Sequence, residues 1–167
     1  MGVEIERKFL LKDHSWRDRV SDSPRSLTQG YFMRAPGGAT VRVRIADETA
    51  FLTIKGRTKG TGALERSEFE YAIPLEDARS MLDEFCGTRV VKKLRYYLKG
   101  DDGFLWEIDE YLDLNEGLFT AEIELPDADT SFQRPSWLGD EVSGDKRYSN
   151  GALSVSPYSE WSNCHEQ

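Results

Sequence analysis

Seven short segments of this chain alternate charged and apolar residues with a period of two. In the first of them, Glu4, Glu6 and Lys8 alternate with the apolar positions Ile5 and Phe9. Successive side chains of a β-strand point to opposite faces, so this pattern gives a strand one charged face and one apolar face. Short alternating runs separated by Gly, Pro, Asp and Ser are typical of antiparallel barrels and sandwiches. We therefore predict a mainly β (α+β) chain.

The same pattern sets the expected boundaries. Strands are predicted over residues 3–11, 27–33, 40–46, 50–55, 65–73, 90–99, 104–111 and 118–125. A helix is predicted over residues 74–85, because apolar residues recur there at helical spacing, Pro74 suits a first turn and Gly87 can end it. Shorter helical segments are expected near residues 14–20, 127–133 and 150–153. One domain, residues 1–153, is expected to precede a C-terminal tail, residues 154–167.

Acidic and basic residues nearly balance on the charged positions of the seven segments. The acids are Glu4, Glu6, Glu68, Glu70, Glu107, Asp109, Glu122 and Glu124, and the bases are Lys8, Arg42, Arg44, Lys55, Arg66, Lys93 and Arg95. A one-sided sheet with a solvated outer face explains most alternating strands. However, like charges two residues apart on one strand repel each other. Such like-charged pairs are expected if the charged faces converge on a multivalent ligand. Both a solvated outer face and a ligand-binding inner face therefore stay open.

A closed sheet with the charged face inside would enclose a polar cavity. About eight strands leave room for a small ligand. Carboxylates without His or thiolate partners favour hard cations such as Mg²⁺ or Mn²⁺, and Lys and Arg bind phosphate oxygens. A polyphosphate with a divalent ion would satisfy both sets of charges. Nucleic acid fits less well, because the interleaved acids would repel its backbone.

Composition excludes several other classes. The formal charge of -8 argues against a generic DNA-binding or membrane-surface protein. His14 and His165 are the two histidines, and Cys86 and Cys164 the two cysteines, which leaves little material for a zinc site or a Ser-His-Asp triad. No apolar run approaches the roughly 20 residues of a membrane helix. We therefore expect a cytoplasmic protein without nucleic-acid or membrane partners.

The segment Glu4-Ile5-Glu6-Arg7-Lys8-Phe9 resembles the E-x-E-x-K opening of the CYTH superfamily, the triphosphate tunnel metalloenzymes. The resemblance continues in the order of the family and covers residues 3 to about 153. It is carried by Gln29-Gly30-Tyr31, Arg42-Val43-Arg44, Thr53-Ile54-Lys55, residues 66–70, Lys93-Leu94-Arg95-Tyr96, Glu107-Ile108-Asp109, residues 121–125 and Asp145-Lys146-Arg147-Tyr148. The chain is most similar to the short, single-domain bacterial branch.

The resemblance implies a closed eight-stranded antiparallel β-barrel, a tunnel with a few peripheral helices. It also implies one or two Mg²⁺ or Mn²⁺ ions, held by Glu4, Glu6 and Glu122, with Glu124, Glu70 and Glu68 around a second ion. The residues implied to bind phosphate are Lys8, Arg42, Arg44, Lys55, Arg66, Lys93, Arg95 and Lys146. Lys8 and Tyr31 are hypothesised to assist proton or charge transfer, and Glu107 and Asp109 to orient basic neighbours.

The activity that the resemblance implies is hydrolysis of inorganic tripolyphosphate to pyrophosphate and phosphate by a metal-activated water. Thiamine triphosphate hydrolysis and class IV-type adenylate cyclisation of ATP are alternatives within the family. A non-catalytic polyphosphate-binding module and a structural β domain are alternatives of other classes. The expected partner is a small-molecule triphosphate, and the expected assembly is a monomer or homodimer.

Overall fold

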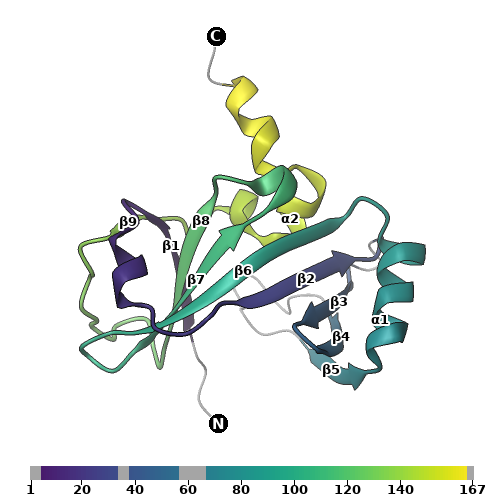
Figure 1. The fold of residues 1–167 in the computed structure, drawn as a ribbon, viewed down its shortest axis with the longest axis horizontal. Helices are drawn as coiled ribbons and strands as arrows, with labels where there is room; N and C mark the ends of the chain where they lie inside the picture. Colours follow the sequence, from purple (N-terminus) through teal and green to yellow (C-terminus); the bar gives the residue numbers. More distant parts are fainter. Residues whose placement is uncertain (1–4, 34–37, 57–66, 165–167) are drawn as a thin grey trace.

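A single antiparallel sheet dominates the computed structural model, which describes residues 5–33, 38–56 and 67–164 of the 167-residue chain (Figure 1). The described residues form nine strands. These are β1 (Ile5–Leu11), β2 (Arg25–Tyr31), β3 (Thr40–Ala46), β4 (Thr49–Lys55), β5 (Glu68–Ile73), β6 (Val90–Lys99), β7 (Leu105–Tyr111), β8 (Phe119–Leu125) and β9 (Leu138–Glu141).

The strands follow the order β5-β4-β3-β2-β6-β7-β8-β1-β9, and every neighbouring pair is antiparallel. This confirms the predicted mainly β antiparallel class. The eight predicted strands correspond to β1–β8, and the bounds of β3 and β6 agree with the prediction. The ninth strand was not predicted, because its four residues are too few to show alternation. It pairs with the outer edge of β1, so the hydrogen-bonded order of the described strands ends at β5 and β9.

The helical segments are short. They are η1 (Ser15–Arg19), α1 (Leu75–Met81), η2 (Leu82–Cys86), η3 (Asp113–Asn115), η4 (Lys146–Tyr148), α2 (Asn150–Val155) and η5 (Tyr158–Cys164). The helix predicted over 74–85 is confirmed as α1 continued by the π-helical turn η2, and it ends at Gly87, whose φ is 58°. The segments predicted near 14–20 and 150–153 are η1 and α2. None of the described helices is long and apolar enough to cross a membrane.

The helix predicted near residues 127–133 is wrong. Asp127 Oδ1 accepts hydrogen bonds from the Asp129 backbone N–H at 2.9 Å and from the Thr130 hydroxyl at 3.0 Å. Such local side-chain bonds compete with helix formation. Residues 127–137 instead run as an irregular segment along the sheet toward β9, and they contribute Phe132 and Trp137 to its apolar cover.

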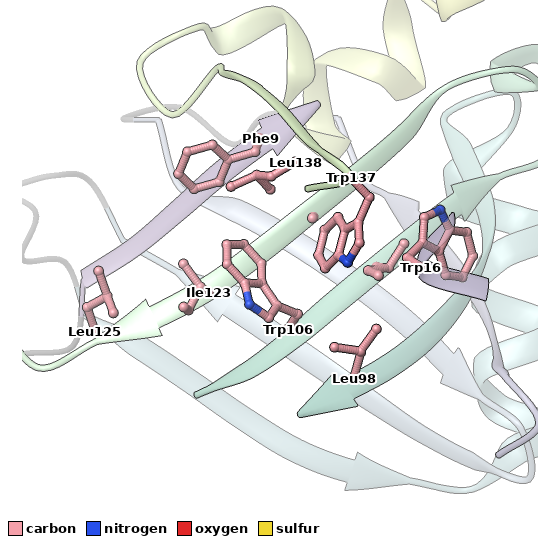
Figure 2. Packing of buried hydrophobic residues seen from close by; sticks show 10 residues of the cluster. Phe9, Trp16, Leu98, Trp106, Ile123, Leu125, Trp137 and Leu138 are labelled. Carbon is pink, nitrogen blue, oxygen red and sulfur yellow. The ribbon is translucent and has the colours of Figure 1, made fainter. Parts of the chain in front are cut away.

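The largest apolar cluster packs against one face of β1, β6, β7 and β8 (Figure 2). Trp106 lies at its centre, with ring centroids 5.5 Å from Trp137 and 5.8 Å from Phe9. Trp16 of η1 packs at the edge of the same cluster. All four aromatic side chains are at most 3% exposed. The cluster residues on β1, β6, β7 and β8 alternate with the charged residues of the same strands. The charged side chains therefore point to the opposite side of the sheet, which we call the inner face.

Two further apolar clusters place the remaining helices. On the apolar side of β3 and β4, α1 packs Ala78 against Val43 and Ala50. Gly30 of β2 has no room for a side chain, because a Cβ there would lie 2.6–2.9 Å from side-chain atoms of η2. The third cluster joins Leu153 of α2 to strand residues with the same parity as the charged positions, Val91 and Tyr111. Therefore α2 packs on the inner side of the sheet.

Candidate active site

Several polar side chains of the inner face are buried. On β2, β4, β6, β7 and β8 these are Gln29, Thr53, Lys93, Asp109, Thr120 and Glu122. A solvated outer surface would leave such side chains open to water. The interpretation of the charged face as a simply wet surface is therefore wrong at these positions. Because buried polar groups need partners, the arrangement of hydrogen bonds and ion pairs decides what the inner face can do.

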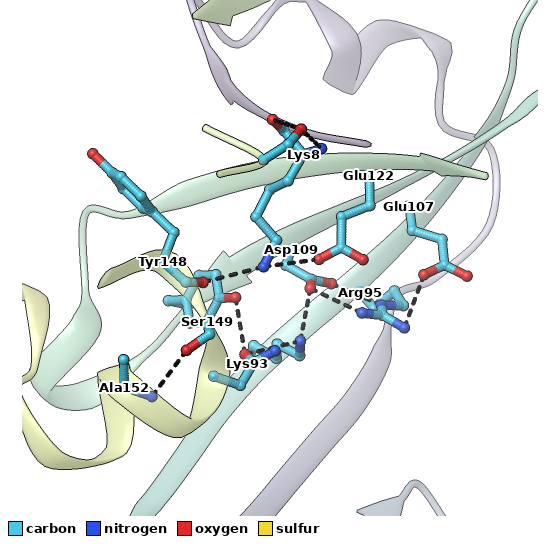
Figure 3. Close-up of polar contacts among 12 residues, drawn as sticks. Lys8, Lys93, Arg95, Glu107, Asp109, Glu122, Tyr148, Ser149 and Ala152 are labelled. Atoms are coloured by element: carbon cyan, nitrogen blue, oxygen red, sulfur yellow. Dashed lines mark hydrogen bonds and ion pairs between the residues drawn. The ribbon is translucent and has the colours of Figure 1, made fainter. Parts of the chain in front are cut away.

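The most buried part of the inner face is an ion-pair cluster of Lys93, Arg95 and Asp109, which we call the Asp109 cluster (Figure 3). Lys93 Nζ lies 2.7 Å from Asp109 Oδ2. Arg95 donates from Nε to Asp109 Oδ1 at 2.8 Å and from Nη2 to Oδ2 at 2.9 Å, as a bidentate fork. Arg95 Nη1 also lies 2.9 Å from Glu107 Oε2. The expectation that Glu107 and Asp109 orient basic neighbours agrees with these contacts.

Burial and pairing act in opposite directions on these groups. Burial alone would raise the pKa of Asp109, but Lys93 and Arg95 outweigh it and hold that pKa at about 2. Burial lowers the pKa of Lys93 to about 8 in spite of Asp109, and Arg95 adds to the lowering. The cluster therefore has one firmly ionised carboxylate between two cations.

Like charges meet on β1 and β8, where Glu6 and Glu122 form what we call the Glu6 pair. The pKa of Glu6 is raised to about 7, first by partial burial and then by repulsion and hydrogen bonding with Glu122, while Lys8 lowers it. Lys8 Nζ lies 3.2 Å from Glu122 Oε1 and donates to the Tyr148 carbonyl at 3.1 Å. Glu124 faces Glu6 in the ladder and adds repulsion. Three glutamates of β1 and β8 therefore stand close together, and Lys8 forms an ion pair with Glu122.

Basic groups crowd the other part of the inner face. Burial lowers the pKa of Arg44, and repulsion from Arg42 and Arg95 lowers it further. Arg42 donates to the Thr53 hydroxyl at 3.3 Å and lies 3.7 Å from Glu70, while its buried Nε has no hydrogen-bond partner. Neighbouring guanidinium groups with a buried unpartnered N–H are suited to bind an anion with several oxygens.

The segment that connects η4 to α2 lies over this site. The Tyr148 carbonyl accepts from Lys8, and Asn150 Oδ1 accepts from Lys93 Nζ at 3.2 Å and from the Tyr111 hydroxyl at 3.0 Å. A Cβ at Gly151 would lie 3.9 Å from Cε1 of Tyr31. Ser149 caps α2 by accepting from the Ala152 N–H at 3.1 Å, which fixes the helix start here.

Sequence reasoning missed the neutral residues of this network. Gln29 is fully buried and bonds both Arg44 and Tyr31. It could have been found, because it stands two residues before Tyr31 on the same strand face and within a motif already noted. Asn150 gave no such signal, since it lies outside the alternating strands.

Not all the predicted site residues come together. Glu4 and Arg66 lie outside the described residues. Lys146 is exposed on η4, and its side chain makes no hydrogen bond or ion pair within the described part of the chain. Lys55 and Glu68 face each other in the β4–β5 ladder. Glu70 accepts from the Thr53 hydroxyl at 2.8 Å.

Two further observations concern Tyr31 and the carboxylates. No hydrogen bond between Lys8 and Tyr31 is found in the described residues, where Tyr31 instead contacts Gln29 and Arg42. Likewise, no three Asp, Glu, His or Cys side chains of residues 5–33, 38–56 and 67–164 gather as a ready-made metal group. The predicted carboxylates that the structure describes are Glu6, Glu68, Glu70, Glu122 and Glu124, and among them Glu6 and Glu122 form a direct contact.

Comparison with known proteins gives close relatives of nearly the same length. An inorganic triphosphatase of Acetivibrio thermocellus is 41% identical over 163 residues, 95% of this chain and 97% of the relative. An inorganic triphosphatase of Nitrosomonas europaea is 35% identical and covers 92% of this chain and 98% of its own. The crystal structure of the inorganic triphosphatase NE1496 superposes with a TM-score of 0.69 at 31% identity, over 93% of this chain and 96% of that chain. Residues 2–152 match the CYTH domain, so the chain belongs to the CYTH domain family.

Proposed function

We propose that this protein hydrolyses a linear triphosphate, with inorganic tripolyphosphate as the preferred substrate and pyrophosphate and phosphate as products. One observation carries the proposal: buried bases crowd part of the inner face, and a glutamate pair without enough counter-charge lies on the strands β1 and β8 of the same face. The full-length relatives named inorganic triphosphatase agree with it. Substrate and a divalent ion together would neutralise both regions.

CYTH triphosphatases depend on a metal ion in general. The donor set fits such an ion, because carboxylate oxygens are the ligands of hard cations, and the pKa of Glu6, raised first by burial and then by repulsion from Glu122, marks a carboxylate that a cation would stabilise. We propose that Glu6 and Glu122 hold Mg²⁺ or Mn²⁺, and that Glu4 completes the set. When bound, the ion would polarise phosphate oxygens and favour deprotonation of a nearby water. Ligation of a second ion by Glu124, Glu70 and Glu68 stays a prediction.

The reaction needs little covalent chemistry from the protein. A water oxygen forms a bond to a terminal phosphorus, the bridging P–O bond breaks with its electron pair, and pyrophosphate leaves as the water proton is released. Arg42, Arg44, Lys93 and Arg95 would bind the oxygens of the triphosphate and stabilise their charge. Lys8 would exchange its bonds to Glu122 and the Tyr148 carbonyl for a phosphate oxygen. Phosphate binding by Lys55, Arg66 and Lys146 stays a prediction.

Organic triphosphates are the competing substrates. Thiamine triphosphate hydrolysis and cyclisation of ATP would use the same phosphate-binding residues. Selectivity for either substrate would depend on protein groups that contact its thiamine or adenosine part. Binding of polyphosphate without turnover is the competing function of another class. A cytoplasmic location, a domain boundary near residue 153, a monomer or homodimer and the absence of nucleic-acid or membrane partners also stay predictions.

Phosphate release from tripolyphosphate, thiamine triphosphate and ATP tests the proposal. We expect turnover of tripolyphosphate with Mg²⁺ or Mn²⁺, none with EDTA, and a loss of about 100-fold or more in Glu6→Gln, in line with losing one stabilising group at a reacting phosphate. Glu48→Gln, an exposed glutamate of the β3–β4 turn, is the matched control and should keep wild-type rates.

Two outcomes would contradict the proposal. Full activity in EDTA or in Glu6→Gln would separate catalysis from the acidic region. Tight binding of tripolyphosphate without release of phosphate under any metal condition would assign the chain to the binding class instead.

A further inference from the structure

Gln29 bridges two residues of the basic region. Its side chain is 0% exposed and stands on β2 opposite Arg44 of β3 and two residues before Tyr31 on the same strand face. Gln29 Oε1 accepts from Arg44 Nε at 2.9 Å, and Gln29 Nε2 lies 2.7 Å from the Tyr31 hydroxyl oxygen. Nothing in the proposed chemistry so far uses this bridge.

Chemistry fixes which way the Gln29 amide points. A guanidinium group has N–H donors and no acceptor, so the atom of Gln29 that faces Arg44 must be the carbonyl oxygen. The reversed amide would set its NH₂ group against another donor and leave its oxygen against the hydroxyl. The NH₂ group therefore faces Tyr31 and donates to the phenolic oxygen.

The phenolic oxygen of Tyr31 accepts from Gln29 and lies near the positive charges of Arg42 and Arg44. Guanidinium groups can only donate, so neither arginine can accept the Tyr31 proton, which is left to be donated elsewhere. Burial raises the pKa of Tyr31, so the proton is retained near neutral pH. Tyr31 is in this way prepared as a donor and is poorly suited to act as a base.

We propose that Gln29 is a positioning residue that fixes Tyr31 as a hydrogen-bond donor toward an oxygen of the bound phosphate chain and holds Arg44 beside it. This inference rests on the proposed triphosphatase function. A phosphate oxygen offers the acceptor that the Tyr31 proton needs, and the bond strengthens as negative charge grows on that oxygen during cleavage. Gln29 itself need not touch the substrate.

Gln29→Glu is the sharpest test, because it keeps the size of the side chain and replaces the NH₂ donor with an acceptor that also carries a negative charge. A carboxylate at this position would accept from Arg44 and also from the Tyr31 hydroxyl, so it would capture the proton that should face substrate. We expect kcat for tripolyphosphate to fall to the level of Tyr31→Phe, about 100-fold below wild type, with a much smaller change in KM. Gln133→Glu, the same substitution at an exposed position of the segment before β9, should keep wild-type kinetics.

The double variant Gln29→Glu/Tyr31→Phe distinguishes a positioning role of Gln29 from a general disturbance of the site. If Gln29 acts through the Tyr31 proton, the double variant should be no slower than either single variant. Multiplied losses, or wild-type kcat in Gln29→Glu, would overturn the inference. Thermal unfolding should show each variant folded, and Gln29→Met, which keeps the volume without hydrogen bonds, serves as a second probe if Gln29→Glu unfolds. Gln29→Met should also slow kcat, and less in the Tyr31→Phe background; equal losses in both backgrounds would overturn the inference.

An NMR measurement that does not depend on catalysis tests the Gln29–Tyr31 hydrogen bond separately from the proposed function. The side-chain amide resonances of Gln29 should shift in an NMR spectrum of Tyr31→Phe, because the phenolic oxygen that accepts from the NH₂ group is removed. Unshifted resonances would overturn the inference even in an active enzyme. If wild type hydrolyses no triphosphate although the resonances shift, the proposed function fails while the bridge itself stands.

Discussion

The Asp109 cluster and the Glu6 pair lie on the same face of the same sheet, yet they treat charge in opposite ways. In the cluster, Asp109 is held between two cations within 3 Å, and its pKa falls to about 2. In the pair, two carboxylates from β1 and β8 meet with one lysine beside them, and the pKa of Glu6 rises to about 7. The first region is neutralised by the protein itself. The second brings like charges together.

This difference separates scaffold from ligand site. Buried ion pairs with several hydrogen bonds hold their side chains in one arrangement, so the Asp109 cluster can present Lys93 and Arg95 to a substrate without first reorganising. An excess of like charge is costly until a counter-ion arrives, so the Glu6 pair should respond to cations. Substitutions in the two regions should therefore give different phenotypes.

The largest effect is expected from Asp109→Asn. The amide cannot balance Lys93 and Arg95, and its NH₂ group would face their donors. Breaking a buried ion pair by removing one partner typically costs about 3–5 kcal/mol. We expect a loss of that size in the free energy of unfolding, measured by urea denaturation.

A second variant keeps this prediction testable if Asp109→Asn does not fold. Adding Lys93→Met removes the fully buried cation that was left unpaired, so the double variant should recover part of the lost stability. If Asp109→Asn unfolds at the wild-type urea concentration, the cluster is not the scaffold described above.

Alternation in the sequence was enough to predict most of the fold. It located β1–β8, and helical spacing located α1, because both signals come from residues that face an apolar cluster. It failed at β9 and at residues 127–133, where a four-residue edge strand and an Asp127 turn have no periodicity to detect. Those segments are placed by tertiary packing of Trp137 and Phe132, which a local pattern does not contain.

The charged residues of the site were predicted more completely than its neutral ones. The alternating pattern predicted that Lys93, Arg95 and Asp109 share one face of the sheet. It could not predict that they form ion pairs, because these depend on the register between β6 and β7. Gln29 and Asn150 carry no charge, so no pattern of acids and bases could reveal them. Their role appears only when their hydrogen-bond partners are seen.

The second prediction concerns pH and the Glu6 pair. The pKa of Glu6 is raised in the folded protein from 4.5 to about 7, so the folded state holds this proton more tightly than the unfolded state. The stability that this contributes is fully present below pH 4.5 and is lost as pH rises through 7. In EDTA, the melting temperature of wild type relative to Glu6→Gln should therefore fall between pH 5 and pH 8. The change should be smaller than in Asp109→Asn, because Glu6 keeps part of its contact with solvent whereas Asp109 is 1% exposed.

Magnesium supplies the matching test. Mg²⁺ should raise the melting temperature of wild type more at pH 8, where Glu6 is ionised, than at pH 5.5, where Glu6 holds a proton. Glu6→Gln should lose most of this response, and Glu48→Gln should keep it. Parallel pH profiles for wild type and Glu6→Gln, with equal responses to Mg²⁺, would show that the pair carries no excess charge.

The smallest effect is expected from Glu107→Gln, the matched control for Asp109→Asn on the same strand. Glu107 also contacts Arg95, but its side chain is 33% exposed, against 1% for Asp109. Water can replace the lost contact, and Arg95 keeps its bidentate bond to Asp109, so the cost should stay below about 1 kcal/mol. Urea denaturation of both variants under the same conditions measures the difference. Similar losses in the two would mean that contact with Arg95, rather than burial of the carboxylate, sets the stability of the cluster.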